Sequence, residues 1–345
     1  MRKDIDLIEL PIKSGKVYVS AFFNMHLLCT FLLAQKYPNI DFIVGGPAVE
    51  DSKFSGVLPT NIQYTTLSVA EFLGEKDGDS SWNIELPREL DGKVFLGYTL
   101  ERFCYWAKCN FCTYPGPNKK REFLRTFVES LAPNGSYRIF LNSPALSPVS
   151  VRKVVPQLVS LPNIEYWAHV RSDPQVYRIL RETLQEAQDN GVRLSSFYPV
   201  NGVEFPSDRM LDWMKKGMTT KLIQDTFVLF HEFGSTPLMA LIFGWNNLCA
   251  KDISQARLFF KEMSDLVDGR IFVKCHALAA KVGTELFDEV EGLGEEIRLG
   301  PFLLGRKLPL NKDQQMLNDD YHRALFEAKF IYINDHSKNP HHDFL

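Results

Sequence analysis

Three cysteines lie within nine positions of this 345-residue chain, in the segment Cys104-Tyr-Trp-Ala-Lys-Cys109-Asn-Phe-Cys112. Their C-x4-C-x2-C spacing follows an apolar run, residues 93–98, that has the length and composition of a β-strand. Barrel folds place their functional sites on loops at the carboxyl ends of strands. Because the chain has only six cysteines, this cluster indicates metal binding or catalysis rather than a disulfide framework.

Three kinds of site compete for this spacing. A plant-type ferredoxin shares it but needs a fourth cysteine, and the next cysteine after Cys112 is Cys249. Structural zinc also needs four ligands, and no histidine follows Cys112 closely. Three thiolates can instead hold three irons of a [4Fe-4S] cubane and leave the fourth open to the amino and carboxylate groups of S-adenosylmethionine (SAM). The cysteine pattern favours the cluster and leaves zinc as an alternative.

The segments that must position the cysteines alternate between apolar runs and amphipathic stretches. Helices are predicted at residues 174–190, ending before Gly191, and 207–216. This alternation predicts parallel βα units, and the six strands between residues 93 and 276 are fewer than the eight of a closed barrel. We therefore expect an α/β fold with a partial (β/α)6 TIM-like barrel. The predicted strands are residues 16–20, 41–44, 93–98, 137–142, 164–169, 194–199, 238–243 and 270–276.

Composition and connectors suggest the domain organisation. A turn-rich connector near residues 76–90 separates a small α/β, truncated Rossmann-like unit (1–90) from the barrel (91–299), which a C-terminal extension (300–345) follows. The net charge of −3 and pI near 6.3 give no reason to expect a nucleic-acid partner. No apolar stretch is long enough to span a membrane and no signal sequence is evident, so we expect a cytoplasmic protein without a membrane partner.

Several segments resemble the radical SAM superfamily, particularly the branch that carries an N-terminal cobalamin-binding domain. Residues 202–217 are similar to the family segment GvESgsdrvLkwmnKG, residues 238–244 to its fifth strand, and residues 281–287 to its PGTpLy segment. The usual cysteine spacing there is C-x3-C-x2-C, so this chain has one residue more. Phe111, before the last cysteine, agrees with the family pattern. The resemblance covers roughly residues 40 to 290 and implies a [4Fe-4S] cluster on Cys104, Cys109 and Cys112.

The resemblance also assigns residues to SAM. It implies that Glu204 contacts the ribose, although an acid at a helix N-terminus can simply cap the helix. Gly244, at the end of the fifth strand, would let the backbone approach the adenine. Arg171 would pair the methionine carboxylate bidentately, with a surface arginine as the alternative. Where relatives carry acidic residues or a GGE element, this chain has Asn142 and Ser143, which supply hydrogen bonds without charge.

The N-terminal unit gives a separate expectation about cobalamin. Residues 41–50, DFIVGGPAVE, resemble the GGPH-type turn of the cobalamin-binding domain, and residues 68–74 correspond to its last elements. The DxHxxG segment that supplies the axial histidine is missing. We therefore expect a truncated descendant of that domain and no bound cobalamin.

The resemblance implies an enzyme that reductively cleaves SAM to a 5′-deoxyadenosyl radical, which then abstracts a hydrogen atom from a substrate. The expected substrate is a ribosomally synthesised peptide, modified by epimerisation or by backbone cleavage and splicing; the need for a small partner protein is left open. A small-molecule natural product is the second reading, and a non-enzymatic, zinc-stabilised binding protein is the third.

Two further features bear on partners and chemistry. Residues 101–125 contain six Lys or Arg against two acids, a basic segment suited to docking an acidic flavodoxin or ferredoxin as electron donor; a plain solvated loop is the alternative. Cys249 follows the predicted strand at residues 238–243 by six residues. A thiol there could return a hydrogen atom to a peptide α-carbon, as an epimerase requires, or could be a small buried hydrophobe.

Overall fold

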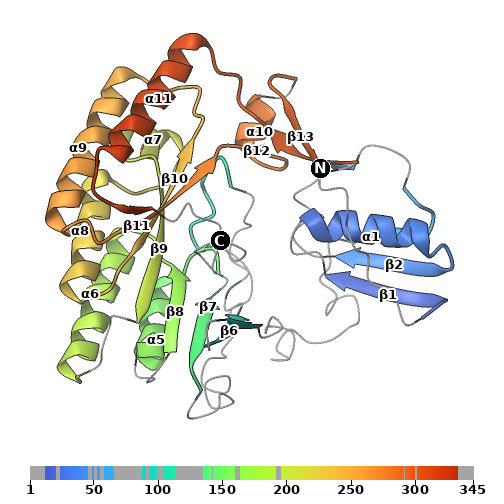
Figure 1. Cartoon of the computed structure of the whole chain (residues 1–345), viewed down its shortest axis with the longest axis horizontal. Helices are drawn as coiled ribbons and strands as arrows, with labels where there is room; N and C mark the ends of the chain where they lie inside the picture. Colours follow the sequence, from blue (N-terminus) through green and yellow to red (C-terminus); the bar gives the residue numbers. More distant parts are fainter. Residues whose placement is uncertain are drawn as a thin grey trace. The chain divides into compact units, whose positions relative to one another are not determined.

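The computed structural model describes residues 12–20, 24–45, 49, 53–54, 58–65, 88–90, 93–98, 101, 104–112, 135–141, 143–159, 164–191, 196–290, 292–299 and 301–332. Contacts divide the chain into two compact units that interleave along the sequence (Figure 1). The small unit comprises Met1–Asp79, Asn110–Thr113 and Ala279–Pro309. The large unit comprises Ser80–Cys109, Tyr114–Leu278 and Leu310–Leu345.

The large unit is built on an eight-stranded sheet of order β15-β11-β10-β9-β8-β7-β6-β5. Every neighbouring pair from β6 to β15 is parallel, and β5 joins β6 antiparallel. The sheet curls into a half-barrel, which confirms the predicted partial TIM-like fold. Its strands are β5 (Arg88–Leu90), β6 (Lys93–Tyr98), β7 (Tyr137–Leu141), β8 (Ile164–His169), β9 (Phe197–Glu204), β10 (Leu238–Phe243), β11 (Phe272–Ala277) and β15 (Ile331–Tyr332).

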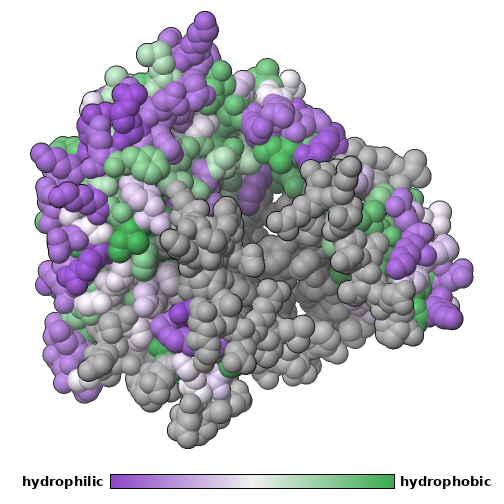
Figure 2. Space-filling model, in the orientation of Figure 1, coloured by the Kyte–Doolittle hydropathy of each residue, from purple (hydrophilic) through white to green (hydrophobic). Residues whose placement is uncertain are grey.

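Helices of the large unit cover one face of this sheet (Figure 1). In α6, apolar residues at helical spacing, from Val176 to Ala187, are buried, and Asp173 caps the N-terminus ahead of Pro174. The outer surface of the helices of the large unit is largely hydrophilic (Figure 2), as expected for helices that bury one face. These helices are α5 (Pro148–Val159), α6 (Pro174–Asp189), α7 (Asp208–Trp213), α8 (Thr220–Glu232), α9 (Ala250–Leu266) and α11 (Lys312–Phe326). No helix in the described ranges has the length and apolarity of a membrane span.

The opposite, inner face of the sheet carries a separate apolar cluster. Side chains alternate between the two faces of a strand, so Phe140, Trp167 and Val200 share the inner face with Leu238 and Phe272. The register pairs Phe140 with Trp167 and Leu238 with both Val200 and Phe272. The inner face is therefore packed with large side chains near its middle, and the residues that follow on each strand lie nearer the carboxyl ends.

The small unit joins N-terminal and C-terminal segments. Three parallel strands, β1 (Gly15–Ser20), β2 (Ile40–Gly45) and β4 (Ile62–Tyr64), accompany α1 (Asn24–Lys36). Phe302 is buried in their core, with its ring 6.2 Å from that of Phe31. The C-terminal part contains β12 (Ala280–Lys281), α10 (Glu285–Glu289), β13 (Glu296–Leu299) and β14 (Phe302–Arg306), and β14 also pairs with β3 (Lys53–Phe54).

Several observed boundaries differ from the expected ones, most of them by one or two residues, and three of the differences are larger. Ala279–Pro309 joins the small unit, although the sequence placed residues up to 299 in the barrel and the rest in an extension. Strand β9 begins and ends later than the predicted 194–199, because its ladders with β8 and β10 continue past Pro199 and Gly202. Helix α7 ends at Trp213, short of residue 216, since Lys215 has a left-handed φ of 56°.

Candidate functional site

The segment after β6 is tied to the start of α5 by a buried carboxylate. Glu101 is 2% exposed, and its carboxylate accepts hydrogen bonds from the Ser147 N–H (2.9 Å) and the hydroxyls of Ser147 and Ser150 (both 2.7 Å). The N-terminus of a helix favours such a negative charge. The Glu101 N–H donates to Ser143 Oγ (2.9 Å), so the chain entering the cysteine loop is held to the loop after β7.

Tyr105 fastens the cysteine loop to the start of α6. Its hydroxyl donates to Asp173, whose other carboxylate oxygen accepts from the N–H groups of Gln175 and Val176. Burial and the Asp173 charge raise the pKa of Tyr105 well above its ordinary value, so the phenol keeps its proton. Cys104, the preceding residue, is therefore positioned next to a half-buried ring whose hydroxyl is a neutral hydrogen-bond donor.

Trp106 connects the loop to the turn after α7. Its indole N–H donates to the Lys215 carbonyl (2.7 Å), and its ring lies 4.8 Å from the Arg171 guanidinium and 4.8 Å from the Lys108 ammonium. The indole also lies directly over Gly217, where an added Cβ would come within 2.1 Å of it. Ala107, the next residue, has a left-handed φ of 44°. It lies between Cys104 and Cys109, where this chain has one residue more than the usual C-x3-C spacing.

Replacing Gly217 by alanine should loosen this contact. Gly217 has a φ of 61°, so alanine meets both backbone strain and the indole. Gly234 is a matched control, because its φ is 78° but nothing lies within 4 Å of an added Cβ. We expect Gly234→Ala to lower the free energy of unfolding by about 1–2 kcal/mol, and Gly217→Ala to lower it clearly more. Urea unfolding of both variants measures this, and equal losses would mean that the indole is not held against Gly217.

Arg171, after β8, is buried among these groups rather than exposed on the surface. It is 7% exposed; its Nη2 donates to the Lys216 carbonyl, and its Nε lies 3.8 Å from Asp173 Oδ2. Its buried Nε has no hydrogen-bond partner among the described residues. The alternative of a surface arginine is therefore wrong, and one donor of this guanidinium remains available.

Glu204 and Lys216 form a buried ion pair at the end of β9. Lys216 Nζ lies 3.1 Å from Glu204 Oε1, with the side chains 7% and 13% exposed. The register between β9 and β10 shifts next to Glu204, whose φ is 62°, and the carboxylate folds over Gly202. The N-cap of α7 is Ser207, so Glu204 is not a helix-capping acid. A strained residue holding a buried carboxylate is typical of a functional site.

The thiol of Cys109 lies within reach of the charges of Lys216, Arg171 and Glu204 and of the Cys104 thiol. Burial raises the pKa of the Cys109 thiol, whereas the positive charges of Lys216 and Arg171 lower it. Thiolates are the ligating form of cysteine, and neighbouring cations stabilise the negative charge of a thiolate-ligated cluster. No three Cys, His, Asp or Glu side chains of the described ranges surround a single metal position. The ligands of a cubane each bind a different iron, so the thiol chemistry and the adjacent cations fit a cluster.

The other predicted site residues of this region are distributed as follows. Phe111 and Cys112 are half-buried and belong to the small unit, where the Asn110 carbonyl accepts from the Leu286 N–H (3.0 Å). Ser143 is buried; its carbonyl accepts from Nδ1 of His169 (3.0 Å). Asn142 lies outside the described residues. The sequence roles of all four therefore stay predictions.

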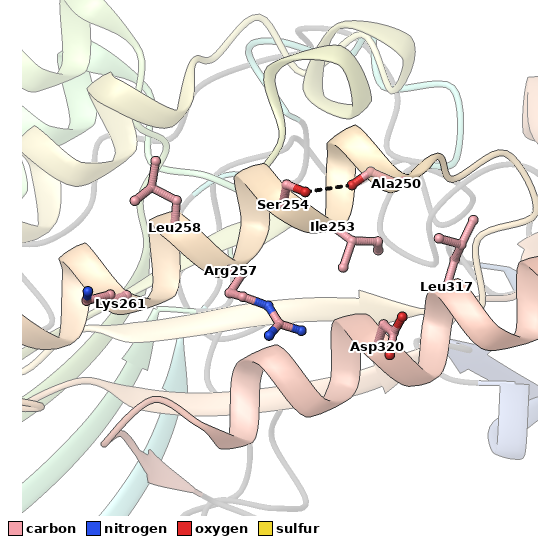
Figure 3. A pocket seen from close by; sticks show the side chains of 8 residues that line it. All are labelled: Ala250, Ile253, Ser254, Arg257, Leu258, Lys261, Leu317 and Asp320. Atoms are coloured by element: carbon pink, nitrogen blue, oxygen red, sulfur yellow. Dashed lines mark hydrogen bonds between the residues drawn. The ribbon is translucent and has the colours of Figure 1, made fainter.

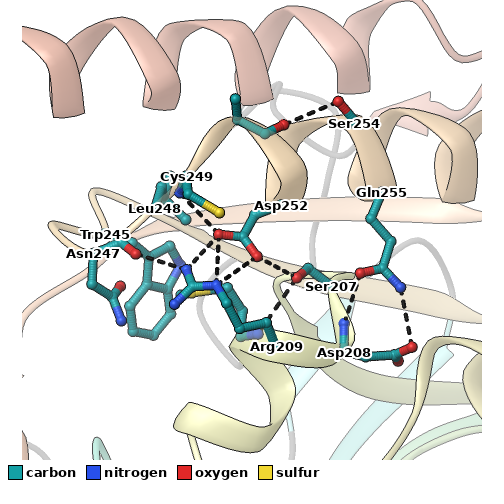
Figure 4. Close-up of polar contacts among 12 residues, drawn as sticks. Ser207, Asp208, Arg209, Trp245, Asn247, Leu248, Cys249, Asp252, Ser254 and Gln255 are labelled. Atoms are coloured by element: carbon teal, nitrogen blue, oxygen red, sulfur yellow. Dashed lines mark hydrogen bonds and ion pairs between the residues drawn. The ribbon is translucent and has the colours of Figure 1, made fainter.

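Gly244 and Cys249 lie at the end of β10 and the start of α9. Gly244 has a φ of 99°, and its N–H donates to Asn318 Oδ1 (2.8 Å). Cys249 is exposed, not a buried hydrophobe, and is the N-cap of α9 (Figure 4). Its N–H donates to Asp252 (2.9 Å), whose carboxylate also accepts from Ser207 and Arg209. Asp252 thus joins the N-termini of α7 and α9, and Cys249 belongs to that junction.

A surface groove of about 480 Å³ lies elsewhere on the large unit, between α9 and α11 (Figure 3). It contains no residue of the cysteine loop and none that follows a strand of the half-barrel directly. The groove is therefore separate from the predicted site residues that follow β6, β8 and β9. The lining residues are Ala250, Ile253, Ser254, Arg257, Leu258, Lys261, Leu317 and Asp320.

Sequence reasoning missed the residues that hold the site together: Glu101, Trp106, Asp173 and Lys216. Asp173 before Pro174 carries a visible signal, since an acid ahead of proline is typical of a helix start. Lys216-Gly217 lies in the segment already matched to the family pattern, but its pairing with Glu204 depends on the bulge in β9. Nothing in the sequence marks Trp106 as the contact of Gly217.

No protein-family model matches the sequence, and no curated protein matches it. Among solved structures, the radical SAM methyltransferase TsrM from Kitasatospora setae, with cobalamin and a [4Fe-4S] cluster bound, has a TM-score of 0.50 at 12% identity, covering 89% of this chain and 73% of that chain. TsrM with tryptophan substrate and a SAM analogue gives 0.51 at 13% identity, covering 81% of this chain and 65% of that chain.

The cobalamin-dependent SAM radical enzyme OxsB, with aqua-cobalamin and SAM bound, has a TM-score of 0.56 at 11% identity. The match covers 89% of this chain but only 58% of the OxsB chain. The chain therefore has the fold of radical SAM enzymes, as the sequence predicted. At these identities the likeness concerns the fold.

Proposed function

We propose that this chain is a radical SAM enzyme whose cluster is held by Cys104, Cys109 and Cys112. The observation that carries the proposal is the attachment of the cysteine loop to the segments after three neighbouring strands: Glu101 to Ser147, Tyr105 to Asp173, and Trp106 to Lys215 and Gly217. A loop held this firmly gives thiolates a defined spacing, which a catalytic constellation needs.

The residues around the loop have complementary roles in this proposal. Arg171 can direct its remaining N–H donor to the methionine carboxylate, while its stacking on Trp106 holds the guanidinium plane in place. Glu204 can accept a hydrogen bond from the ribose, and the ion pair with Lys216 holds that carboxylate in place. When bound, the cluster would supply the electron that cleaves SAM and yields the 5′-deoxyadenosyl radical.

The substrate we propose is a ribosomally synthesised peptide, with a small-molecule natural product as the second candidate. The likeness in fold does not distinguish a peptide from a small-molecule substrate. TsrM is described with tryptophan as substrate, but at 13% identity the likeness concerns the fold alone. We further propose a flavodoxin or ferredoxin as electron donor, attracted by the basic segment 101–125. Of its six basic residues, Lys108 is described. The other five lie outside the described residues: Arg102, Lys119, Lys120, Arg121 and Arg125.

Anaerobic reconstitution with iron and sulfide tests this function. The proposed enzyme should bind iron and sulfide in equal amounts and, after reduction by dithionite with SAM present, release 5′-deoxyadenosine detected by mass spectrometry. Protein that retains zinc, gains no iron-sulfur absorption and forms no 5′-deoxyadenosine would instead be the zinc-stabilised binding protein.

Cobalamin gives a second expected result. Because the sequence lacks the DxHxxG segment, protein purified from cells supplied with hydroxocobalamin is expected to contain no corrin and to show an unchanged visible spectrum. TsrM and OxsB bind cobalamin, so the measurement separates this chain from them. Corrin in a 1:1 ratio to protein would contradict the expectation.

Cys249 offers a test of the reaction type. If the exposed thiol donates a hydrogen atom to a peptide radical, Cys249→Ala should still form 5′-deoxyadenosine but give no inverted product. Ser254→Ala is the control, since Ser254 is in the same helix and donates only to the Ala250 carbonyl (3.0 Å). Chiral amino-acid analysis of the product in deuterated water measures inversion. Unchanged inversion in Cys249→Ala would favour radical cleavage or rearrangement over a thiol-dependent epimerisation.

A further inference from the structure

Lys274 is a buried lysine on the inner face of the half-barrel. It lies in β11, two residues after Phe272 of the inner cluster, and is 8% exposed. Besides burial, the charge of the next residue, Cys275, raises the pKa of Tyr321 in α11. Cys275 therefore faces α11, which lies on the opposite face of the sheet. Alternation along the strand therefore directs Lys274 inward, away from the helices.

The neighbours of Lys274 across the sheet are small. The register pairs Lys274 with Ala240 in β10, and Ala240 with Gly202 in β9. In the preceding row, Phe272 pairs with Leu238 and Leu238 with Val200, so that row is filled by bulky side chains. The ammonium of Lys274 thus lies at the level where the inner face changes from large residues to small ones, toward the carboxyl ends of the strands.

No carboxylate of the described residues pairs with Lys274. Glu204, at the end of β9, is already paired with Lys216 at 3.1 Å. Burial lowers the pKa of His169 most, and the positive charge of Lys274 lowers it as well, so the imidazole is neutral. Burial also lowers the pKa of Lys274 to about 8, as expected for an ammonium that has lost water without gaining a counter-charge. A buried charge without a partner is costly in free energy.

We propose that the ammonium group of Lys274 binds a carboxylate of the substrate on the inner face of the half-barrel. This inference rests on the proposed function and adds the substrate's charge to it. One uncompensated positive charge among the described inner-face groups matches a monoanion better than a doubly charged phosphate. The small side chain of Ala240 leaves room beside the ammonium for the carboxylate and the adjoining carbon, while the Glu204 carboxylate covers Gly202.

Competitive labelling of the reconstituted holoenzyme tests the proposal. Lysines are reductively methylated in the presence of SAM, with acetate, its neutral isostere acetamide, or inorganic phosphate, and mass spectrometry gives the methylation of each lysine. Lys221, whose side chain is 77% exposed, is the internal reference. We expect acetate to reduce methylation of Lys274 at least about threefold at a few times its Kd, with acetamide inactive and Lys221 unaffected. Ala240→Leu should weaken the protection by acetate, because leucine fills the adjoining space.

Each other outcome overturns the assignment. Equal labelling with acetate and acetamide would show no carboxylate site, and stronger protection by phosphate would show a different anion. Protection by SAM alone would assign the ammonium to the methionine carboxylate instead of the substrate. Lack of methylation at Lys274 in every arm would contradict an accessible inner face. Because labelling needs no turnover, failure to form 5′-deoxyadenosine identifies failure of the proposed function separately.

Discussion

Replacing Cys104, Cys109 or Cys112 individually by alanine is expected to abolish both cluster assembly and SAM cleavage. Each thiolate is the only protein ligand proposed for its iron, and the chain offers no other cysteine in this loop. Iron content after anaerobic reconstitution and the yield of 5′-deoxyadenosine measure the effect, and both should fall to the level of samples without added iron.

The remaining cysteines provide matched controls for this series. Cys275→Ala removes a half-buried thiol in β11 whose pKa burial raises to about 11, and Cys29→Ala removes a thiol in α1. Both variants should assemble the cluster and cleave SAM at the rate of the unmodified protein. Full turnover by any of the three loop variants would contradict the assignment of the ligands.

The second large effect is expected at the buried pair of Glu204 and Lys216. Glu204→Gln removes the carboxylate with which Lys216 pairs at 3.1 Å, so the free energy of unfolding should fall by about 3 kcal/mol, as when one partner of a buried ion pair is lost. Binding of SAM should weaken about tenfold, because a hydrogen bond to a charged acceptor is lost. Urea unfolding and equilibrium binding of SAM to the reconstituted protein measure the two effects.

A double variant separates stability from binding. Glu204→Gln combined with Lys216→Met removes both charges of the pair, so stability should return toward that of the unmodified protein while SAM binding stays weak. Asp225→Asn is the control, since its partner Lys221 is exposed and such surface pairs contribute little. If the double variant recovers SAM affinity together with stability, Glu204 acts only through the ion pair and does not contact the ribose.

Strands that stand alone as apolar runs were predictable from the sequence. β6, β8 and β10 begin and end where expected, because turn residues flank each run. The bounds of β9 were not predictable. Pro199 and Gly202 interrupt its apolar run in the sequence, whereas its pairing with β8 and β10 continues past them. The exchange of Ala279–Pro309 into the small unit depends on β14 pairing with the two-residue strand β3. So short a strand, paired so far along the chain, leaves no local signal.

The candidate site shows the same division between local and long-range information. The three cysteines could be proposed from their residue type and spacing, and Arg171 and Glu204 from the order of segments that resemble the radical SAM superfamily. Their partners could not, because Trp106 reaches Gly217, and Arg171 reaches Lys216, only through the folded sheet. Lys274 left a partial signal, a lysine inside the run Phe272–Ala277, but its direction follows only from the register of β10 and β11.

The central claim is that three cysteines hold a cluster with one iron open to SAM. Electron paramagnetic resonance of the dithionite-reduced, reconstituted protein, recorded with and without SAM, tests it most directly. The account predicts the signal of a reduced [4Fe-4S] cluster whose g-values shift when SAM is added, because SAM binds the open iron. A cluster signal that SAM leaves unchanged, or no cluster signal in protein that has taken up zinc, would contradict it.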